Sequence, residues 1–125
     1  MIPGLTDSEL EAILEAAAGV GARAAAYLML RLPLELKALF TEWLETHVPD
    51  RAARVLSRIR ECRDGALYVA DFETRGRGTG AHADLLESRF HLACRRYGLN
   101  ERVGFELDTT RFHVPSRPGD QLTLW

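Results

Sequence analysis

Apolar residues recur at helical spacing in four segments of the chain, and residues that favour helix ends lie beside these segments. The first segment begins at the sequence TDSE, residues 6–9, which fits a capping box, and it stops before Gly19 and Gly21. The last segment is followed by Gly98 and Leu99, which suit a Schellman ending. The pattern predicts four amphipathic helices, over about residues 6–18, 33–47, 51–62 and 81–97.

The pattern changes between the first two helices, where residues 24–32 are apolar at nearly every position. Such a run predicts a parallel strand that is buried on both faces. A strand of this kind needs neighbouring strands to pair with its backbone, and the chain offers only one convincing candidate. We therefore expect the rest of the sheet to lie N-terminal to Met1 or to come from another chain.

Composition and charge narrow the class of protein without identifying a partner. The chain has 125 residues, enough for one domain, and a formal net charge of −2, so no strong field directs it to nucleic acid or to an anionic membrane. No apolar run is long enough to span a bilayer and no secretory signal is present, which predicts a cytoplasmic protein with no membrane partner. Cys62 and Cys94 indicate neither a disulfide framework nor a zinc site.

Residues 1–62 and 74–100 resemble the C-terminal part of bacterial radical SAM proteins related to spore photoproduct lyase, a DNA repair photolyase-like family. In such proteins a partial (β/α) barrel holds a [4Fe-4S] cluster on a CxxxCxxC loop, and S-adenosylmethionine binds the cluster. The resemblance implies an α/β fold, in which residues 1–63 are the last helix-strand-helix unit of the barrel. Residues 64–125 would then be a C-terminal extension with one long helix.

The resemblance assigns a short motif to the cofactor. Residues 2–7, IPGLTD, are similar to the end of the radical SAM motif GxIxGxxE. By this similarity Ile2 would contact the adenine, Gly4 would allow a tight turn, and Asp7 would be the acidic residue at the helix start. The family also approaches the adenine with backbone at the end of the next strand, here Leu30, Arg31 and Leu32.

The cluster motif CxxxCxxC is absent, and two cysteines cannot supply three thiolates to one cluster. We therefore expect this chain alone to have no cofactor and no radical SAM activity. S-adenosylmethionine and a [4Fe-4S] cluster are implied for a full-length relative. The implied partner is the missing N-terminal half of the barrel, encoded by the same gene or supplied as a separate chain.

The sequence TRGRGTG, residues 74–80, is the second candidate site because it places three glycines and two arginines before a helix. Backbone N–H groups there could hold a phosphate while the arginines supply charge. The residues of this anion or nucleic-acid candidate are Arg75, Gly76, Arg77, Gly78 and Gly80. An ordered structural loop is the favoured interpretation, and a flexible connector remains a third.

Other chemistry-bearing residues have ordinary explanations. His91 and Cys94 are one helical turn apart, but two ligands do not make a metal site, so we expect an ordinary helix face and no metal. The leading function is thus a radical SAM fragment that is inactive alone. The alternative is an independent small α/β interaction domain, either monomeric or a homo-oligomer that completes its sheet across chains, with residues 74–80 as the anion or nucleic-acid contact.

Overall fold

The computed structural model describes residues 1–101, 109–113 and 115, and these residues form a helical structure. Residues 102–108, 114 and 116–125 of the predicted C-terminal extension lie outside the described residues. The α-helices are α1 (Leu10–Gly19), α2 (Leu36–His47), α3 (Pro49–Glu61) and α4 (Ala81–Arg96), and the 3₁₀ helices are η1 (Asp7–Glu9) and η2 (Thr109–Arg111).

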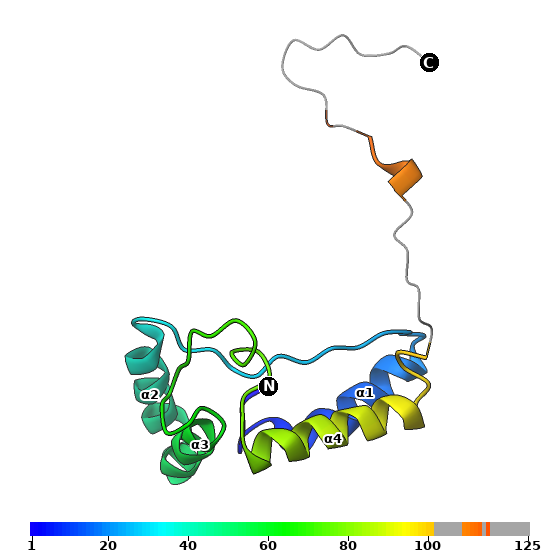
Figure 1. Ribbon diagram of the computed structural model, residues 1–125. Coiled ribbons are helices and arrows are strands. Elements are labelled where there is room, and N and C mark those ends of the chain that lie inside the picture. Colours follow the sequence, from blue (N-terminus) through cyan, green and yellow to red (C-terminus); the bar gives the residue numbers. More distant parts are fainter. Residues whose placement is uncertain (102–108, 114, 116–125) are drawn as a thin grey trace.

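The predicted α/β class is wrong for this structure, because its described part contains no strand and therefore no helix-strand-helix unit of a (β/α) barrel. Residues 22–33 are nevertheless extended, and they cross from one pair of helices to the other (Figure 1). A strand is defined by its pairing with a neighbour, and no second extended segment among the described residues lies beside this one over its length. We call residues 22–32 the extended segment.

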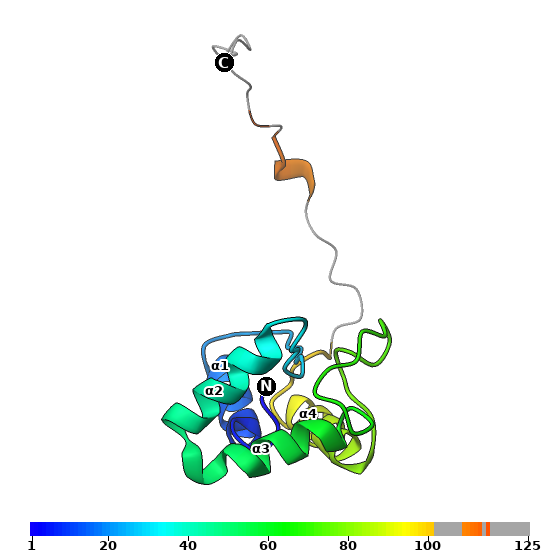
Figure 2. The ribbon, with the colours of Figure 1, turned by 90° about the vertical axis from the view of Figure 1, so that its left-hand side faces the viewer.

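The helices pack as two pairs, α1 with α4 and α2 with α3 (Figures 1 and 2). Each pair has its own apolar cluster: Leu14 and Phe90 are central to the first, and Leu44 and Val55 to the second. The extended segment contributes to both, since Tyr27 packs against the first cluster and Leu32 is buried in the second. Its side chains thus join two helix pairs that contact each other little.

The boundaries of the helices agree closely with the apolar periodicity. The predicted Schellman ending of α4 is confirmed, because the Leu99 N–H donates to the Cys94 carbonyl at 2.9 Å and Gly98 has a φ of 68°. Pro49 is the first residue of α3, where its missing N–H costs nothing. Within the described residues, no helix has both the length and the apolar character needed to cross a membrane.

The two faces of α2 provide a test of the packing. Leu44 is completely buried between α2 and α3, whereas Leu39 on the same helix is 55% exposed. We expect Leu44→Ala to lower the free energy of unfolding by about 2–5 kcal/mol, because it leaves a cavity in a close-packed cluster. Leu39→Ala, the matched control, should change it by less than about 0.5 kcal/mol. Urea denaturation followed by circular dichroism measures both, and equal effects would contradict the packing described.

Candidate functional site

The N-terminal residues form a closed turn, which we call the Ile2–Asp7 turn. The Ile2 carbonyl accepts hydrogen bonds from the N–H groups of Leu5 at 3.1 Å and Thr6 at 3.0 Å. The Thr6 hydroxyl accepts from the Ile2 N–H, and the Asp7 carboxylate accepts from the Gly4 N–H, both at 2.9 Å. The predicted capping box is therefore wrong, because Thr6 makes no side-chain cap and instead closes the turn before η1.

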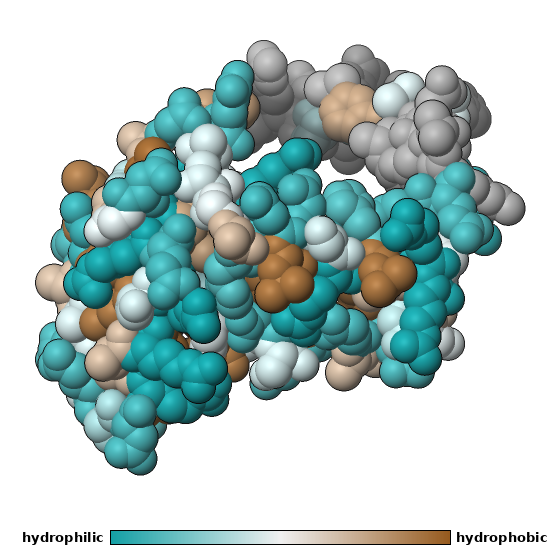
Figure 3. All heavy atoms as spheres, turned by 60° about the horizontal axis from the view of Figure 1, so that its bottom comes forward, coloured by the Kyte–Doolittle hydropathy of each residue, from teal (hydrophilic) through white to brown (hydrophobic). Residues whose placement is uncertain are grey.

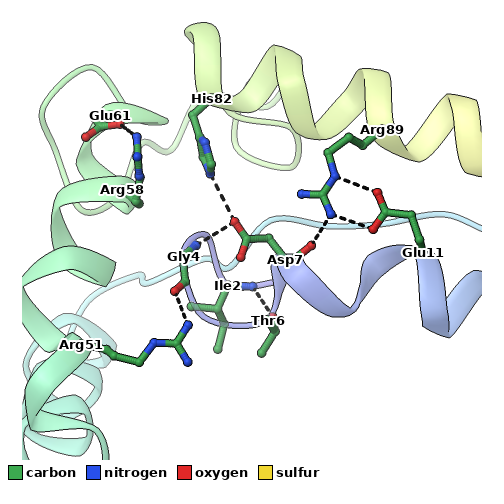
Figure 4. A network of polar contacts seen from close by, with 10 residues as sticks. All are labelled: Ile2, Gly4, Thr6, Asp7, Glu11, Arg51, Arg58, Glu61, His82 and Arg89. Carbon is green, nitrogen blue, oxygen red and sulfur yellow. Dashed lines mark hydrogen bonds and ion pairs between the residues drawn. The ribbon is translucent and has the colours of Figure 1, made fainter.

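Cationic side chains from two helices hold the Ile2–Asp7 turn (Figure 4). Arg51 on α3 donates from Nη2 to the Gly4 carbonyl at 2.8 Å. Arg89 on α4 donates from Nη2 to the Asp7 carbonyl at 2.9 Å and makes a two-pronged ion pair with Glu11, both bonds at 2.7 Å. The hydrogen bonding between the Glu11 carboxylate and the Arg89 guanidinium lowers the pKa of Glu11 and raises the pKa of Arg89. The turn is thus fastened between α3 and α4.

Gly4 occupies a position that other residues would strain. Its φ is 76°, in the left-handed region, and an added Cβ would lie 3.2 Å from Cγ of Arg58. Gly4 therefore lies in a tight turn that few other residues could adopt.

The Ile2–Asp7 turn lies against the end of the extended segment. The Met1 carbonyl accepts a hydrogen bond from the Leu30 N–H at 2.8 Å, and the Met1 nitrogen donates to the Leu28 carbonyl at 2.7 Å. Ile2 and Leu30 pack against the cluster that contains buried Leu32. Of the residues assigned to the adenine, Ile2, Leu30 and Leu32 therefore share one apolar cluster, whereas the neighbours of Gly4 are on α3.

A buried arginine that the sequence analysis missed fixes the other side of Leu30. Arg63 is 2% exposed, and its Nη2 donates to the carbonyls of Leu30 at 2.9 Å and Arg75 at 2.8 Å. Its Nε and Nη1 are buried without a partner, and the loss of hydration lowers the pKa of the guanidinium. Arg63 lies in the charged stretch ECRD, which gave no signal that one arginine would be buried.

Arg63 also connects the extended segment to the loop at residues 74–80. The Gly76 carbonyl in that loop accepts from the Met29 N–H at 2.9 Å. Gly78 has a φ of 82°, and a Cβ there would lie 2.9 Å from the Cys62 carbonyl oxygen. The loop is therefore packed tightly against its surroundings.

The charged groups of this loop are directed at the protein itself. The Arg75 guanidinium lies over the Phe72 ring, 4.3 Å from its centroid, and Arg77 lies 3.6 Å from the carboxylate of Glu87. The N–H groups of Arg75, Arg77 and Gly78 donate to carbonyls within residues 71–74. Gly80 precedes α4 with a φ of 83° and no side-chain cap. The structure thus places the five candidate residues in one loop, where three of their backbone N–H groups donate to the loop's own carbonyls and the Arg77 side chain stays largely exposed.

The two cysteines lie in different apolar clusters. Cys62 is buried with Met29, Ala83 and Leu86, and burial raises the pKa of its thiol. Cys94 is buried between α1 and α4, where its Sγ accepts from Asn100 at 3.6 Å. Burial raises the pKa of the Cys94 thiol as well. His91 and Cys94 line an open hollow of about 430 Å³ at the end of α4.

No group of three metal-binding side chains occurs in the part of the chain that the structure describes. Comparison with known proteins finds no matching family model, curated protein or solved structure.

The strained glycine provides the first test of the site. We expect Gly4→Ala to destabilise the protein by about 1–2 kcal/mol, because the side chain is disfavoured at this φ and meets Arg58. Gly19→Ala is the matched control, since Gly19 ends α1 with no atom within 4 Å of an added Cβ. The control should be neutral or stabilising by up to about 1 kcal/mol. Thermal and urea denaturation would contradict this account if Gly4→Ala were the milder change.

The burial of both thiols provides a second test. At pH 8 each thiol stays protonated to a greater extent than a free cysteine, because its pKa is raised, and it is also shielded from reagent. We expect Cys62 and Cys94 to react with a disulfide reagent at least about tenfold more slowly in the folded protein than in urea. Spectrophotometric thiol titration measures the two rates. A fast phase of one thiol per folded chain would contradict the burial.

Proposed function

We propose that this chain provides the adenosine side of an S-adenosylmethionine site in a radical SAM enzyme resembling spore photoproduct lyase. The observation that carries the proposal is the hydrogen bond between the Met1 carbonyl and the Leu30 N–H at 2.8 Å. It brings the turn that contains Ile2 and Gly4 against residues 30–32, and the family resemblance assigns both segments to the same adenine. The proposal requires no sheet within this chain.

The residues of this region suit an adenosine group. Ile2 and Leu30 offer apolar side chains that are only partly buried, as an adenine face requires. Arg31 is exposed, and its backbone N–H and carbonyl groups make no hydrogen bond within the described structure. These groups can therefore bind the polar edge of a nucleobase. When bound to a reduced cluster, S-adenosylmethionine is a source of radical chemistry.

The iron–sulfur cluster does not fit this chain. Cys62 and Cys94 lie in separate clusters and are buried as apolar groups, so they cannot bind one metal cluster together. The proposed enzyme therefore receives its three cluster cysteines from another stretch of polypeptide, in the same gene product or in a partner chain. By itself the chain is expected to have no radical SAM activity.

The alternative, an interaction domain that binds an anion or nucleic acid through residues 74–80, has less support. Arg77 is close to an acidic side chain, and the loop's own carbonyls occupy several of its N–H groups. A phosphate would have to displace these contacts, whereas the backbone groups of exposed Arg31 make no hydrogen bond to any described residue. The cofactor role is thus better supported than the anion role.

The experiment begins with the coding DNA upstream of the Met1 codon, translated in the same frame. We expect it to encode CxxxCxxC, and we expect the protein expressed from the whole frame to cleave S-adenosylmethionine to 5′-deoxyadenosine under a strong reductant. In that protein Ile2→Ala should raise the KM for S-adenosylmethionine about tenfold, because an apolar contact is worth about 1–2 kcal/mol. Anaerobic turnover followed by chromatography of the nucleoside product measures the effect.

Ile13→Ala is the matched control, because Ile13 on α1 is 59% exposed and lies outside the turn. This variant should leave the KM unchanged. A frame that lacks CxxxCxxC, or equal effects of the two isoleucine variants, would contradict the proposed cofactor role.

A further inference from the structure

One side of α2 carries apolar side chains that remain about half exposed. Leu36, Leu39 and Trp43 follow one another at spacings of three and four residues, so they lie on the same side of the helix. They are 42%, 55% and 43% exposed, whereas Leu44 on the neighbouring side is completely buried against α3. The helix lies at the edge of the molecule, and its outer side is turned to the viewer in Figure 2. We call Leu36, Leu39 and Trp43 the α2 patch.

The aromatic residue of the α2 patch is held in place by its neighbours. The Trp43 ring stacks with the Phe40 ring, with centroids 6.0 Å apart and planes at 13°, and the His47 ring lies 5.3 Å away, one turn further along. Phe40 in turn packs against the apolar cluster between α2 and α3. A tryptophan that is already ordered loses little conformational freedom when a partner binds, and tryptophan is enriched among the residues that dominate binding energy. Trp43 is therefore suited to anchor a partner.

The turn before α2 adds a further exposed apolar group. Leu34 is 80% exposed and has a φ of 50°, a conformation that is rare for leucine. The Leu36 N–H donates to the Pro33 carbonyl at 3.1 Å, so this turn leads directly into the helix. Backbone strain of this kind is found preferentially at functional sites, where the surrounding structure imposes it. Leu34 thus places strain and apolar exposure together at the start of the helix that carries the α2 patch.

Other exposed apolar side chains are more scattered. The face of the molecule at the bottom of Figure 1 is largely hydrophilic, with its apolar side chains in small separate patches (Figure 3). Single apolar residues are normal at a protein surface, whereas several on one face of a helix indicate contact with another molecule. The α2 patch is of the second kind, because its three residues are neighbours on one helix.

Acidic side chains border the α2 patch on one side. Glu35 lies four residues before Leu39 and Glu42 lies three residues after it, so both are its neighbours on the helix surface. Both glutamates are exposed, and neither makes an ion pair with a described residue. Lys37 lies on the opposite side of the helix from this border. The border is therefore negatively charged and open to a cationic partner.

We propose that the α2 patch binds a short amphipathic helix of a partner protein, with apolar residues on one side and Lys or Arg residues along one border. The apolar side would pack on Leu36, Leu39 and Trp43, and the cationic border would lie against Glu35 and Glu42. From Leu36 to Trp43 the helix rises by about 10 Å, which corresponds to about two turns of a partner helix.

A second copy of the chain is a poorer occupant of the α2 patch. In an antiparallel two-fold pair of α2 helices, the same border of each helix faces the other, so Glu35 and Glu42 of the two copies would repel. A parallel two-fold pair would direct this border at the side of α2 that α3 already covers. The proposal is also separate from the cofactor role, because none of these residues belongs to the Ile2–Asp7 turn or to residues 30–32.

The test measures binding of a synthetic peptide to the full chain. The probe is a fluorescein-labelled peptide of two Leu-Ala-Lys-Leu-Leu-Lys-Lys repeats, and its matched control carries Glu in place of each Lys. We expect the basic peptide to bind with a dissociation constant in the micromolar range. The acidic peptide should bind at least about tenfold more weakly, because its charges meet Glu35 and Glu42. Fluorescence anisotropy measures both affinities.

A pair of leucine substitutions locates the binding surface. Leu39→Ala removes a contact of the α2 patch without removing a buried side chain, so it should weaken binding of the basic peptide about fivefold. Leu92→Ala is the matched control, because Leu92 on α4 is 61% exposed and lies outside the patch, and it should leave the affinity unchanged. Glu42→Gln should weaken binding about two- to threefold, an effect that added salt reduces.

Three results would overturn the proposal: no saturable binding of the basic peptide, equal binding of the two peptides, or equal effects of the two leucine variants. A dimer in sedimentation analysis that Leu39→Ala dissociates would overturn it in favour of a second copy. The measurement involves no cofactor, so its outcome is independent of the test of the cofactor role.

Discussion

The constraint on which this structure depends is the need of every extended backbone group for a hydrogen-bond partner. A helix satisfies most of its own groups, but residues 22–32 cannot, and the chain around them is arranged to compensate. The side-chain amide of Asn100, the loop carbonyl of Gly76 and the backbone of Met1 each satisfy part of the segment. Both helix pairs pack on the side chains of this segment, so its pairing fixes how the pairs are placed.

Arginine does much of the joining between parts that are distant in sequence. Arg51 and Arg89 donate to backbone carbonyls of the Ile2–Asp7 turn, and Arg63 donates to two carbonyls in different segments. A guanidinium suits this role because its several donors can bind more than one acceptor at fixed angles. Arg63 achieves this at a cost, since two of its nitrogens are buried without an acceptor among the described residues. Polar contacts therefore hold the junction between the turn, the extended segment and the loop, although two buried donors there lack a hydrogen-bond partner in the described structure.

The four helices could be predicted from the sequence because their signals are local: an apolar residue every three or four positions, a break at Pro49 between two helices, and Gly98 after one end. The sheet could not, since a run such as residues 24–32 indicates extended chain but does not supply a neighbour. The role of Thr6 was predicted wrongly because its hydroxyl binds the Ile2 N–H, and the TDSE pattern fits both arrangements. Ile2 and Leu30 were assigned to one site by resemblance, whereas Arg63 and Asn100 act through contacts that no local pattern encodes.

The pairing of Arg89 with Glu11 has a consequence for how the chain is made. The two residues are separated by 78 positions, so α1 has left the ribosome long before its partner helix exists. A ten-residue helix is marginal in water by itself. Until α4 is synthesised, the α1 segment therefore remains unfolded or has its apolar face only transiently covered. The chain between α1 and α4 must close into a long loop before packing of the two helices can stabilise the fold. Ribosome-bound chains that stop before α4 are the forms of this protein most exposed to aggregation and to capture by chaperones.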